Sequence, residues 1–282
     1  MITKFKTPTD FRKSLENRLK NLANQTHNDL QRLRRTVAFD RLLARLLDAN
    51  DTPFILKGGY AMELRFSNAR ATKDIDLTFI KKTNQLVKNV ILEELKNLSL
   101  KNLGDFFTYQ IGDAQLDLEN APYGGARYPV SSYIDGKLFV RFQLDVGGDA
   151  IVSETETIQG KDWLGFCGIP APLLKMISIE QQFAEKLHAY SLPRADRKNT
   201  RVKDLIDMLL LTNVRTLDFN CLKRALEQVF KVRNTHCLPP ALEMPPPEWE
   251  RPYLELAKEC SLKMSISETF SRIVNIYGLM LG

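Results

Sequence analysis

Cysteine is scarce in this sequence. It occurs four times in 282 residues, at Cys167, Cys221, Cys237 and Cys260. These positions are dispersed, and no two of them have the CxxC spacing typical of zinc sites and redox motifs. The three histidines form no metal-binding pattern either. We therefore exclude a disulfide scaffold and a zinc finger, and we expect reduced thiols in a cytoplasmic protein.

Long apolar runs are absent as well. No stretch approaches the roughly 20 apolar residues that a membrane-spanning helix needs. The first residues, MITKFKTPTDFRKS, lack the apolar core of a secretory signal peptide. No internal repeat is visible, and the only biased tract is the proline-rich stretch 238–247. We expect a cytosolic protein with no membrane partner.

The composition that remains is that of an ordinary globular protein. Hydrophobic residues make up 44% of the chain and charged residues 26%, which is enough to build a sizeable core. The formal net charge is +6 and the pI is about 9.0. This cationic bias is compatible with a nucleotide or nucleic-acid partner, and equally with a basic protein that has neither.

Apolar spacing divides the chain into a mixed part and a helical part. Helices are predicted from Thr9 onward and at 28–47, 86–98, 179–191, 202–211, 220–232, 248–260 and 266–281. Strands are predicted at 54–56, 74–79, 106–111, 128–134 and 138–146, with a hairpin turn at Asp135-Gly136. The proline-containing stretch 164–179 is interpreted as the crossover between the parts. We expect an N-terminal domain at 1–165 and a mainly helical C-terminal domain at 166–282.

The stretch 54–77 combines a glycine turn with two aspartates. A short apolar strand runs into Lys57-Gly58-Gly59, and a second strand carries Asp74 and Asp76. Residues two apart on a strand point to the same face, so the two carboxylates should converge and repel each other. A divalent cation such as Mg²⁺ would relieve that repulsion, and the glycine amides could bind a phosphate. This pattern predicts phosphoryl or nucleotidyl transfer, although a tight turn before an exposed strand end gives the same residues.

Asp145 is a candidate third carboxylate. It ends the predicted strand 138–146 and lies directly before a second glycine pair. If that strand end faces the two aspartates, Asp145 would be a third metal ligand. A strand-end aspartate that caps the following turn is the alternative.

Charged residues also interrupt the predicted helix pair 179–191 and 202–211. Lys186 lies in the first helix, and Lys203, Asp204 and Asp207 lie in the second, with a basic loop before them. Asp204 and Asp207 are three apart and should share a helix face, as should Lys203 and Asp207 at four apart. The group could hold a triphosphate or an RNA backbone, or it could be a surface ion pair beside a solvated loop, and from this segment alone we favour the surface ion pair. The arginines of the helix 28–47 pose the same choice, and there we favour solvated side chains over a phosphate track.

Five blocks in this order resemble one protein family. The blocks are LKGGYAMELRF, ATKDIDL, QLDVG, FAEKLHA and RVKDLIDML, and together they cover about 56–211. The series resembles the AbiEii family, which comprises nucleotidyltransferase-like toxins of abortive-infection and toxin–antitoxin systems. The resemblance implies an α/β (α+β) fold: a nucleotidyltransferase-like mixed sheet with flanking helices, followed by a helical C-terminal region.

The resemblance also implies roles for particular residues. The catalytic set would be Asp74, Asp76, Lys186, Asp204 and Asp145, of which Asp74, Asp76 and Asp145 would hold metal. The nucleotide-binding set would be Gly58, Gly59, Lys57, Thr72 and Lys203. Many related transferases have serine where this chain has Gly59, so here the backbone amide would have to contact the phosphate. The hydroxyl of Thr72 is a candidate for modification under antitoxin control.

The implied function is a toxin that transfers NMP from an NTP to RNA. The acceptor would be an RNA such as the 3′ end of a tRNA, Mg²⁺ would be the cofactor, and a cognate antitoxin would be a partner. Two alternatives use the same fold. One is a nucleotidyltransferase acting on a small molecule or a protein, and the other is an inactive module that binds nucleotide or RNA.

Overall fold

The structure is a computed structural model. It describes residues 3–47, 52–80, 88–118, 124–148, 155–193, 201–214 and 216–281. Contacts divide the chain into two compact units. The first comprises Met1–Tyr60, Ala71–Gly148 and Thr157–Met176, and the second comprises Ala61–Arg70, Asp149–Glu156 and Ile177–Gly282. The predicted domains at 1–165 and 166–282 stay a prediction.

The described residues form the following elements along the chain. The helices are α1 (Pro8–Thr26), α2 (Leu30–Leu46), α3 (Gly58–Arg65), α4 (Lys88–Ser99), α5 (Ile179–Ser191), α6 (Val202–Leu211), α7 (Phe219–Arg233), α8 (Glu250–Glu259) and α9 (Ile266–Leu281), with short 3-10 turns η1 (Gly165–Cys167) and η2 (Pro247–Trp249). The strands are β1 (Phe54–Lys57), β2 (Asp74–Phe79), β3 (Phe107–Ile111), β4 (Leu116–Asp117), β5 (Gly125–Ile134), β6 (Lys137–Gly147), β7 (Glu156–Gln159) and β8 (Leu173–Met176). This mixed architecture with C-terminal helices confirms the expected fold class.

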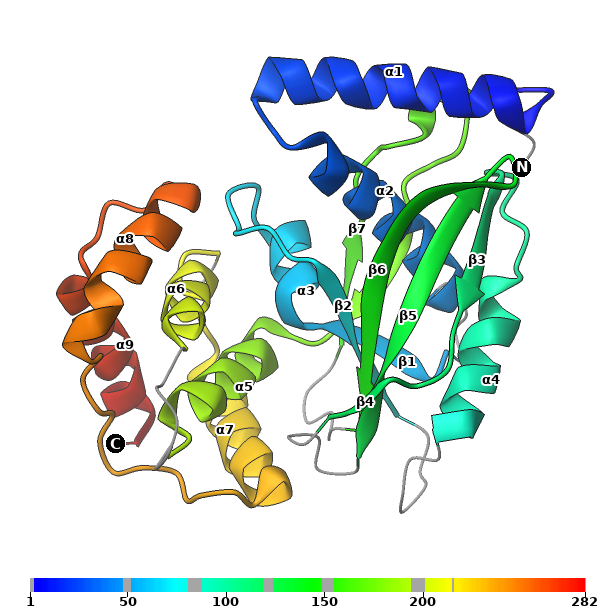
Figure 1. Cartoon of the computed structure of the whole chain (residues 1–282). Coiled ribbons are helices and arrows are strands. Elements are labelled where there is room, and N and C mark those ends of the chain that lie inside the picture. The colour runs from blue at the N-terminus through cyan, green and yellow to red at the C-terminus, as the bar shows by residue number, and fades with distance from the viewer. Residues whose placement is uncertain are drawn as a thin grey trace. The chain divides into compact units, whose positions relative to one another are not determined.

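A mixed eight-stranded sheet is the framework of the first unit (Figure 1). The strand order is β3-β5-β6-β2-β1-β8-β7, and β4 pairs with β5 outside this path. Strand β2 lies between β1, to which it is antiparallel, and β6, to which it is parallel. The two aspartates of β2 are therefore in the middle of the sheet, with paired strands on both sides.

The central strands alternate between an apolar and a polar face. In β2, Ile75 and Leu77 are fully buried, whereas the two aspartates beside them are half-buried. Helix α2 covers the apolar face, where the ring of Phe39 lies 4.8 Å from that of Phe142 in β6. Because side chains alternate along a strand, packing the apolar positions against α2 directs the polar positions to the opposite face.

The hairpin β5–β6 contains the predicted turn. Asp135 and Gly136 both have positive φ angles, 58° and 63°, as a two-residue type I′ turn requires. Arg12 of α1 donates hydrogen bonds of 2.8–2.9 Å to three carbonyls at this turn. A bulge lies close to the turn, where the pairing register shifts between Ser132 and Tyr133. The turn prediction is thus confirmed, and the long ladder beyond it fixes which residues face each other across the hairpin.

Two arginines of α2 contradict the expectation that its arginines are solvated. Arg41 and Arg45 are nearly fully buried and pair with the fully buried Asp105, with N···O distances of 2.7 Å and 2.6 Å. They are four residues apart, so they share a helix face, and that face points inward. The expectation was wrong for these two because their acidic partner is about 60 residues away in the sequence.

The stretch 164–179 is more than a crossover. Its residues 173–176 form β8, which runs parallel to β1 with Leu56 opposite Met176. The strand is only four residues long and follows Pro172, so its sequence has no clear alternation that could have identified it.

The second unit is largely helical. Helices α5 to α9 share a core in which Phe183, Leu205, Leu226 and Tyr253 are fully buried. The helices predicted at 179–191, 202–211, 220–232 and 266–281 are confirmed within a residue or so at each end. None of the described helices has the length and apolar character needed to cross a bilayer.

Candidate functional site

The glycine turn contacts one of the two aspartates directly. Gly58 has a φ of +67°, and a Cβ atom at this position would lie 1.9 Å from Oδ2 of Asp76. The amide of Gly59 points at the same oxygen with an N···O distance of 3.4 Å, which is longer than an ordinary hydrogen bond. Only glycine fits at position 58, because both the backbone conformation and the carboxylate exclude a side chain.

The other aspartate of β2, Asp74, is held by a hydroxyl group. Thr72 donates a hydrogen bond of 2.8 Å to Oδ1 of Asp74, and Thr72 itself is buried. On the neighbouring strand Gln143 lies opposite Asp74. The Oε1 atom of Gln143 is buried and has no hydrogen-bond partner among the described residues. Asp74 therefore has a fixed orientation beside an unsatisfied amide oxygen.

Four charged residues form one row across four strands. Lys57 of β1 is paired with Asp76 of β2, Asp76 with Asp145 of β6, and Asp145 with Arg127 of β5. We call these four residues the charged row. Residues that pair across neighbouring strands point to the same face, so the row lies on the polar face of the sheet.

The end of the charged row is a two-pronged ion pair. Nε and Nη2 of Arg127 each lie 2.7 Å from one oxygen of Asp145. The hydrogen bonds to Asp145 raise the pKa of Arg127, and the charges of Asp145, Asp74 and Asp76 add to this against a smaller effect of desolvation. Sequence reasoning missed Arg127, because only the register of β5 against β6 brings it to Asp145.

The oxygen atoms at Asp74 and Asp76 suit a hard divalent cation. The two carboxylates share a face with the unsatisfied Oε1 of Gln143, and Mg²⁺ prefers such oxygen ligands. Within the described residues, no group of three or more acidic, histidine or cysteine side chains is arranged to hold a metal ion. Asp145, the expected third ligand, is instead bonded to Arg127 through both of its oxygens. Two carboxylates are sufficient, since Mg²⁺ commonly takes its remaining ligands from water and substrate phosphates.

The second unit contains a buried group of opposite charges around Lys186. Its Nζ atom lies 3.1 Å from Asp204 and 2.7 Å from Asp207, and Asp207 also pairs with Arg70 at 3.0 Å. Burial opposes the charged form of Lys186, but Asp207 and Asp204 outweigh this and raise its pKa. Burial likewise opposes the ionised form of Asp207, and Lys186 and Arg70 nevertheless lower its pKa. The prediction that Asp204 and Asp207 share a helix face is confirmed.

Lys203 lies beside this group. Desolvation lowers the pKa of Lys203, and the nearby charges of Arg70, Lys186 and Arg201 add to this while Asp204 opposes it. The expectation of a surface ion pair here was wrong, because Asp207 is fully buried and pairs with Lys186 and Arg70. Arg70 was not among the predicted site residues, and its distance in the sequence from α6 explains why.

The predicted residues thus fall into two groups. Lys57, Gly58, Gly59, Thr72, Asp74, Asp76 and Asp145 belong to the first unit, and Lys186, Lys203 and Asp204 belong to the second. Within each group the side chains contact or neighbour one another as described above. Their catalytic and binding roles stay predictions.

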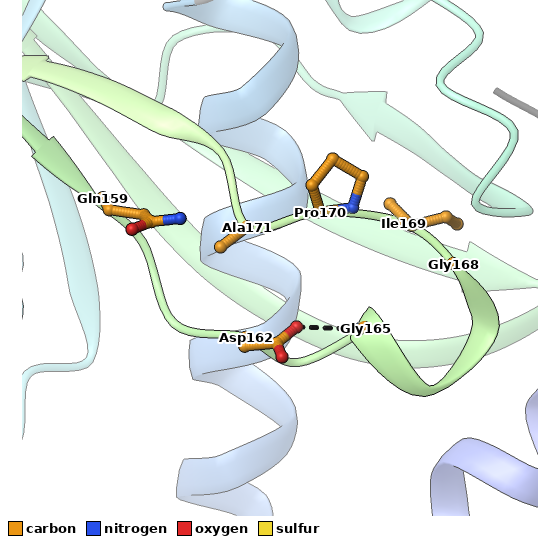
Figure 2. Close-up of a pocket in the computed structure, with 7 residues that line it drawn as sticks. All are labelled: Gln159, Asp162, Gly165, Gly168, Ile169, Pro170 and Ala171. Atoms are coloured by element: carbon orange, nitrogen blue, oxygen red, sulfur yellow. Dashed lines mark hydrogen bonds between the residues drawn. The ribbon is translucent and has the colours of Figure 1, made fainter.

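A cavity of about 600 Å³ lies elsewhere in the first unit, in the connection between β7 and β8 (Figure 2). It is lined by Gln159, Asp162, Gly165, Gly168, Ile169, Pro170 and Ala171. The carboxylate of Asp162 accepts a hydrogen bond of 2.8 Å from the amide of Gly165, so this acid caps a turn. No predicted site residue lines the cavity, and one turn-capping acid does not form a catalytic centre.

The chain is similar to known proteins in its family and in its fold. Residues 41–273 match the family described as "Nucleotidyl transferase AbiEii toxin, Type IV TA system". Among solved structures, "MenT4, nucleotidyltransferase toxin Rv2826c from Mycobacterium tuberculosis H37Rv" is 15% identical with a TM-score of 0.55, over 93% of this chain and 98% of that chain. A putative nucleotidyltransferase from H. pylori is 16% identical with a TM-score of 0.48, over 90% of this chain and 96% of that chain. No curated protein matches. The family match confirms the resemblance seen in the sequence, and the likeness to MenT4 confirms the fold.

Proposed function

The chain belongs to the AbiEii family of nucleotidyltransferase toxins, and we propose that it transfers NMP from an NTP to an RNA acceptor, such as the 3′ end of a tRNA, with Mg²⁺. The nucleotidyltransferase activity, the NTP substrate and a cognate antitoxin follow from the family, whose chemistry generally uses a divalent metal. The proposed parts are the RNA acceptor, the identity of the metal and the residues that act. The observation that carries the proposal is the contact between Asp76 and the Gly58 turn, with Asp74 on the same face.

Asp74 and Asp76 are the proposed metal ligands. Their oxygens, together with the unsatisfied Oε1 of Gln143, are the donors that a hard cation prefers. When bound, Mg²⁺ would neutralise charge on the triphosphate and polarise the phosphorus that is attacked. Thr72 fixes the orientation of Asp74, and the close approach of Gly58 fixes that of Asp76.

The reaction itself needs few protein groups. A hydroxyl of the acceptor attacks the α-phosphorus of the NTP, a new O–P bond forms in line, and the bond to pyrophosphate breaks. We propose that a carboxylate of the charged row, Asp76 or Asp145, accepts the proton of the hydroxyl. Lys57 and the amides of Gly58 and Gly59 are the proposed phosphate-binding groups. Positioning and electrostatics supply most of the rate in such transfers.

Lys186 is proposed to offset charge on the leaving pyrophosphate. Asp204 and Asp207 keep its ammonium charged and fix its position, as the raised pKa of Lys186 indicates. Lys203 is the proposed second phosphate contact of this group. These roles follow from the family resemblance. The ion pairs with Asp204 and Asp207 would fix the position of the Lys186 side chain.

The RNA acceptor is supported by the family and by the net charge of +6. Fewer arginines are available for RNA than the sequence suggested, because Arg41 and Arg45 are buried and Arg34 pairs with Glu16 at 2.6 Å. The residues 194–200 of the predicted basic loop lie outside the described residues. The proposed phosphate contacts are Lys203 and Arg201, and Nη1 of Arg201 lies 3.6 Å from Oδ2 of Asp204. The proposed setting is the cytoplasm.

Labelled NTP tests the proposal directly. The full chain is incubated with each α-labelled NTP, purified tRNA and Mg²⁺, and label in RNA and release of pyrophosphate are measured. We expect both signals, and we expect Asp74→Asn and Asp76→Asn to remove both while circular dichroism stays unchanged. Asp113→Asn is the matched control, since Asp113 is an exposed aspartate of the same unit.

Each other outcome selects a different function. Pyrophosphate release without labelled RNA, in the presence of total metabolites or protein, would indicate a small-molecule or protein acceptor. No pyrophosphate release with any NTP would indicate a binding module, and full activity in both aspartate variants would refute the proposed site.

A further inference from the structure

Asp145 lies between one group of like charge and one of opposite charge. Its partner on β2 is Asp76 and its partner on β5 is Arg127. Neighbouring strands are about 4.8 Å apart, so the carboxylates of Asp76 and Asp145 are close neighbours and repel each other. Arg127 offsets this repulsion from the far side by binding both oxygens of Asp145.

A second arginine–aspartate group in the same unit shows what a purely structural pair looks like. Arg41, Arg45 and Asp105 expose at most 4% of their side chains. Arg127 exposes 35% of its side chain, and Asp145 exposes 10%. The guanidinium of Arg127 therefore keeps access to solvent, and it can move away from Asp145 without itself becoming a buried, unpaired charge.

A divalent cation would compete with Arg127 for Asp145. The planar guanidinium takes both oxygens of the carboxylate, and a doubly charged ion bound to the same carboxylate would repel the guanidinium. An ion held by both carboxylates also relieves the repulsion between Asp76 and Asp145 more fully than Arg127, whose guanidinium bonds to Asp145.

We propose that Arg127 is a positioning residue that holds Asp145 when metal is absent and gives it up when a divalent cation binds to Asp74 and Asp76. Arg127 thereby weakens metal binding by the free protein and lets Asp145 join the site only when the cation is present. This inference rests on the proposed function, because it needs the metal site at Asp74 and Asp76.

The test is the binding of Mn²⁺ alone to the nucleotide-free full chain, with unbound Mn²⁺ measured by electron paramagnetic resonance. Removing the competing cation with Arg127→Gln should lower the half-saturating Mn²⁺ concentration about tenfold. Arg141→Gln is the matched control, because Arg141 lies on the same face of β6 four residues from Asp145 and should leave binding unchanged. In an Asp145→Asn background, Arg127→Gln should have no effect, since the contested carboxylate is gone.

Unchanged or weaker Mn²⁺ binding in Arg127→Gln would overturn the inference. It would also be overturned if Arg127→Gln tightened Mn²⁺ binding as much in the Asp145→Asn background as in the native chain, because that result would show only a long-range effect of charge. If Arg127→Gln fails to fold by circular dichroism, Arg127→Lys decides. Lysine keeps the charge and loses the two-pronged geometry, so tighter Mn²⁺ binding than in the native chain supports the inference and equal binding overturns it. If Asp74→Asn binds Mn²⁺ as well as the native chain, the assignment of the metal site fails. If Asp74→Asn loses Mn²⁺ binding and Arg127→Gln leaves it unchanged, only the inference about Arg127 fails.

Discussion

The hydroxyl of Tyr60 donates a 2.6 Å hydrogen bond to Oδ1 of Asp40, and both side chains are fully buried. Tyr60 directly follows the glycine pair of the proposed site. The other oxygen of Asp40 accepts a hydrogen bond of 3.1 Å from the backbone amide of Lys161. Asp40 thus joins α2, the residue after the glycine turn and the start of the connection between β7 and β8.

Removing this hydroxyl should destabilise the protein. In Tyr60→Phe, Oδ1 of Asp40 loses its nearest donor inside the core, so we expect the free energy of unfolding to fall by about 1–3 kcal/mol. Urea unfolding measures the change. Tyr133→Phe is the control, because the hydroxyl of Tyr133 bonds to Gln110 near the surface and its loss should cost much less. Equal stability of the native chain and Tyr60→Phe would contradict the structural role of this bond.

The same carboxyl should make stability depend on pH. Burial raises the pKa of Asp40 from 3.8 to about 6, against the smaller opposing effects of Tyr60, Lys161 and Arg41. Between these values the folded state holds a proton that the unfolded state has released, so stability should fall as the pH rises from about 4 to about 6. The loss contributed by Asp40 should approach roughly 3 kcal/mol.

Asp40→Asn should remove that contribution, so the test compares the slope of unfolding free energy against pH in the two proteins. The difference between them isolates Asp40 from other titrating groups. Parallel slopes between pH 4 and 6 would show that the carboxyl ionises normally in the folded chain.

Gly58 offers a contrast with another glycine of similar conformation. Gly58→Ala places a methyl group on Asp76, whereas Gly136→Ala, at a φ of +63°, finds no atom within 4 Å. Both variants should pay the strain of a left-handed backbone, about 1–2 kcal/mol. Only Gly58→Ala should displace the carboxylate, and transfer to RNA should then fall about a hundredfold. Similar activity in the two variants would mean that Asp76 need not lie where the structure places it.

Lys186 should matter for stability as well as activity. Lys186→Ala leaves Asp204 and Asp207 buried with less cationic compensation, so we expect unfolding to become easier by about 3–5 kcal/mol. Lys231→Ala, at an exposed position of α7, is the control. Urea unfolding of both variants measures the loss of stability, and labelling of RNA measures the loss of catalysis separately. A small effect, within about 0.5 kcal/mol, would show that the two aspartates tolerate the loss of this lysine.

Local patterns in the sequence were sufficient for most helices and for one turn. Helix α9 follows from apolar residues at helical spacing, because it buries one face, with Thr269, Ile273, Tyr277 and Met280. Helices α5 and α6 were predicted as well, although α6 is buried at nearly every position. The hairpin turn follows from Asp135-Gly136, because these two residue types accept positive φ angles. The glycine turn and the shared face of Asp74 and Asp76 were likewise expected from the order strand, glycine turn and strand in residues 54–77.

Partners that depend on long-range pairing were not predictable in the same way. Arg127 meets Asp145 only through the register of β5 against β6, and Arg70 meets Asp207 across 137 residues of sequence. Asp105 likewise neutralises two arginines that its own surroundings in the sequence do not identify. A single sequence gives the type of charge and the face of the element, and tertiary contacts determine which opposite charge is nearest.

The bulge beside the β5–β6 turn has a consequence for the distant end of the hairpin. Tyr133 faces Leu138, but the next pair is Ser132 with Val140, so one additional residue enters on β6. Continued without that residue, the ladder would bring Arg127 opposite Leu144 instead of Asp145. Because adjacent residues of a strand point to opposite sides, the side chain of Asp145 would then be buried against α2. A single insertion or deletion near the tip is therefore expected to be far more harmful than most substitutions there, although roughly 25 Å of strand separates the tip from the proposed chemistry.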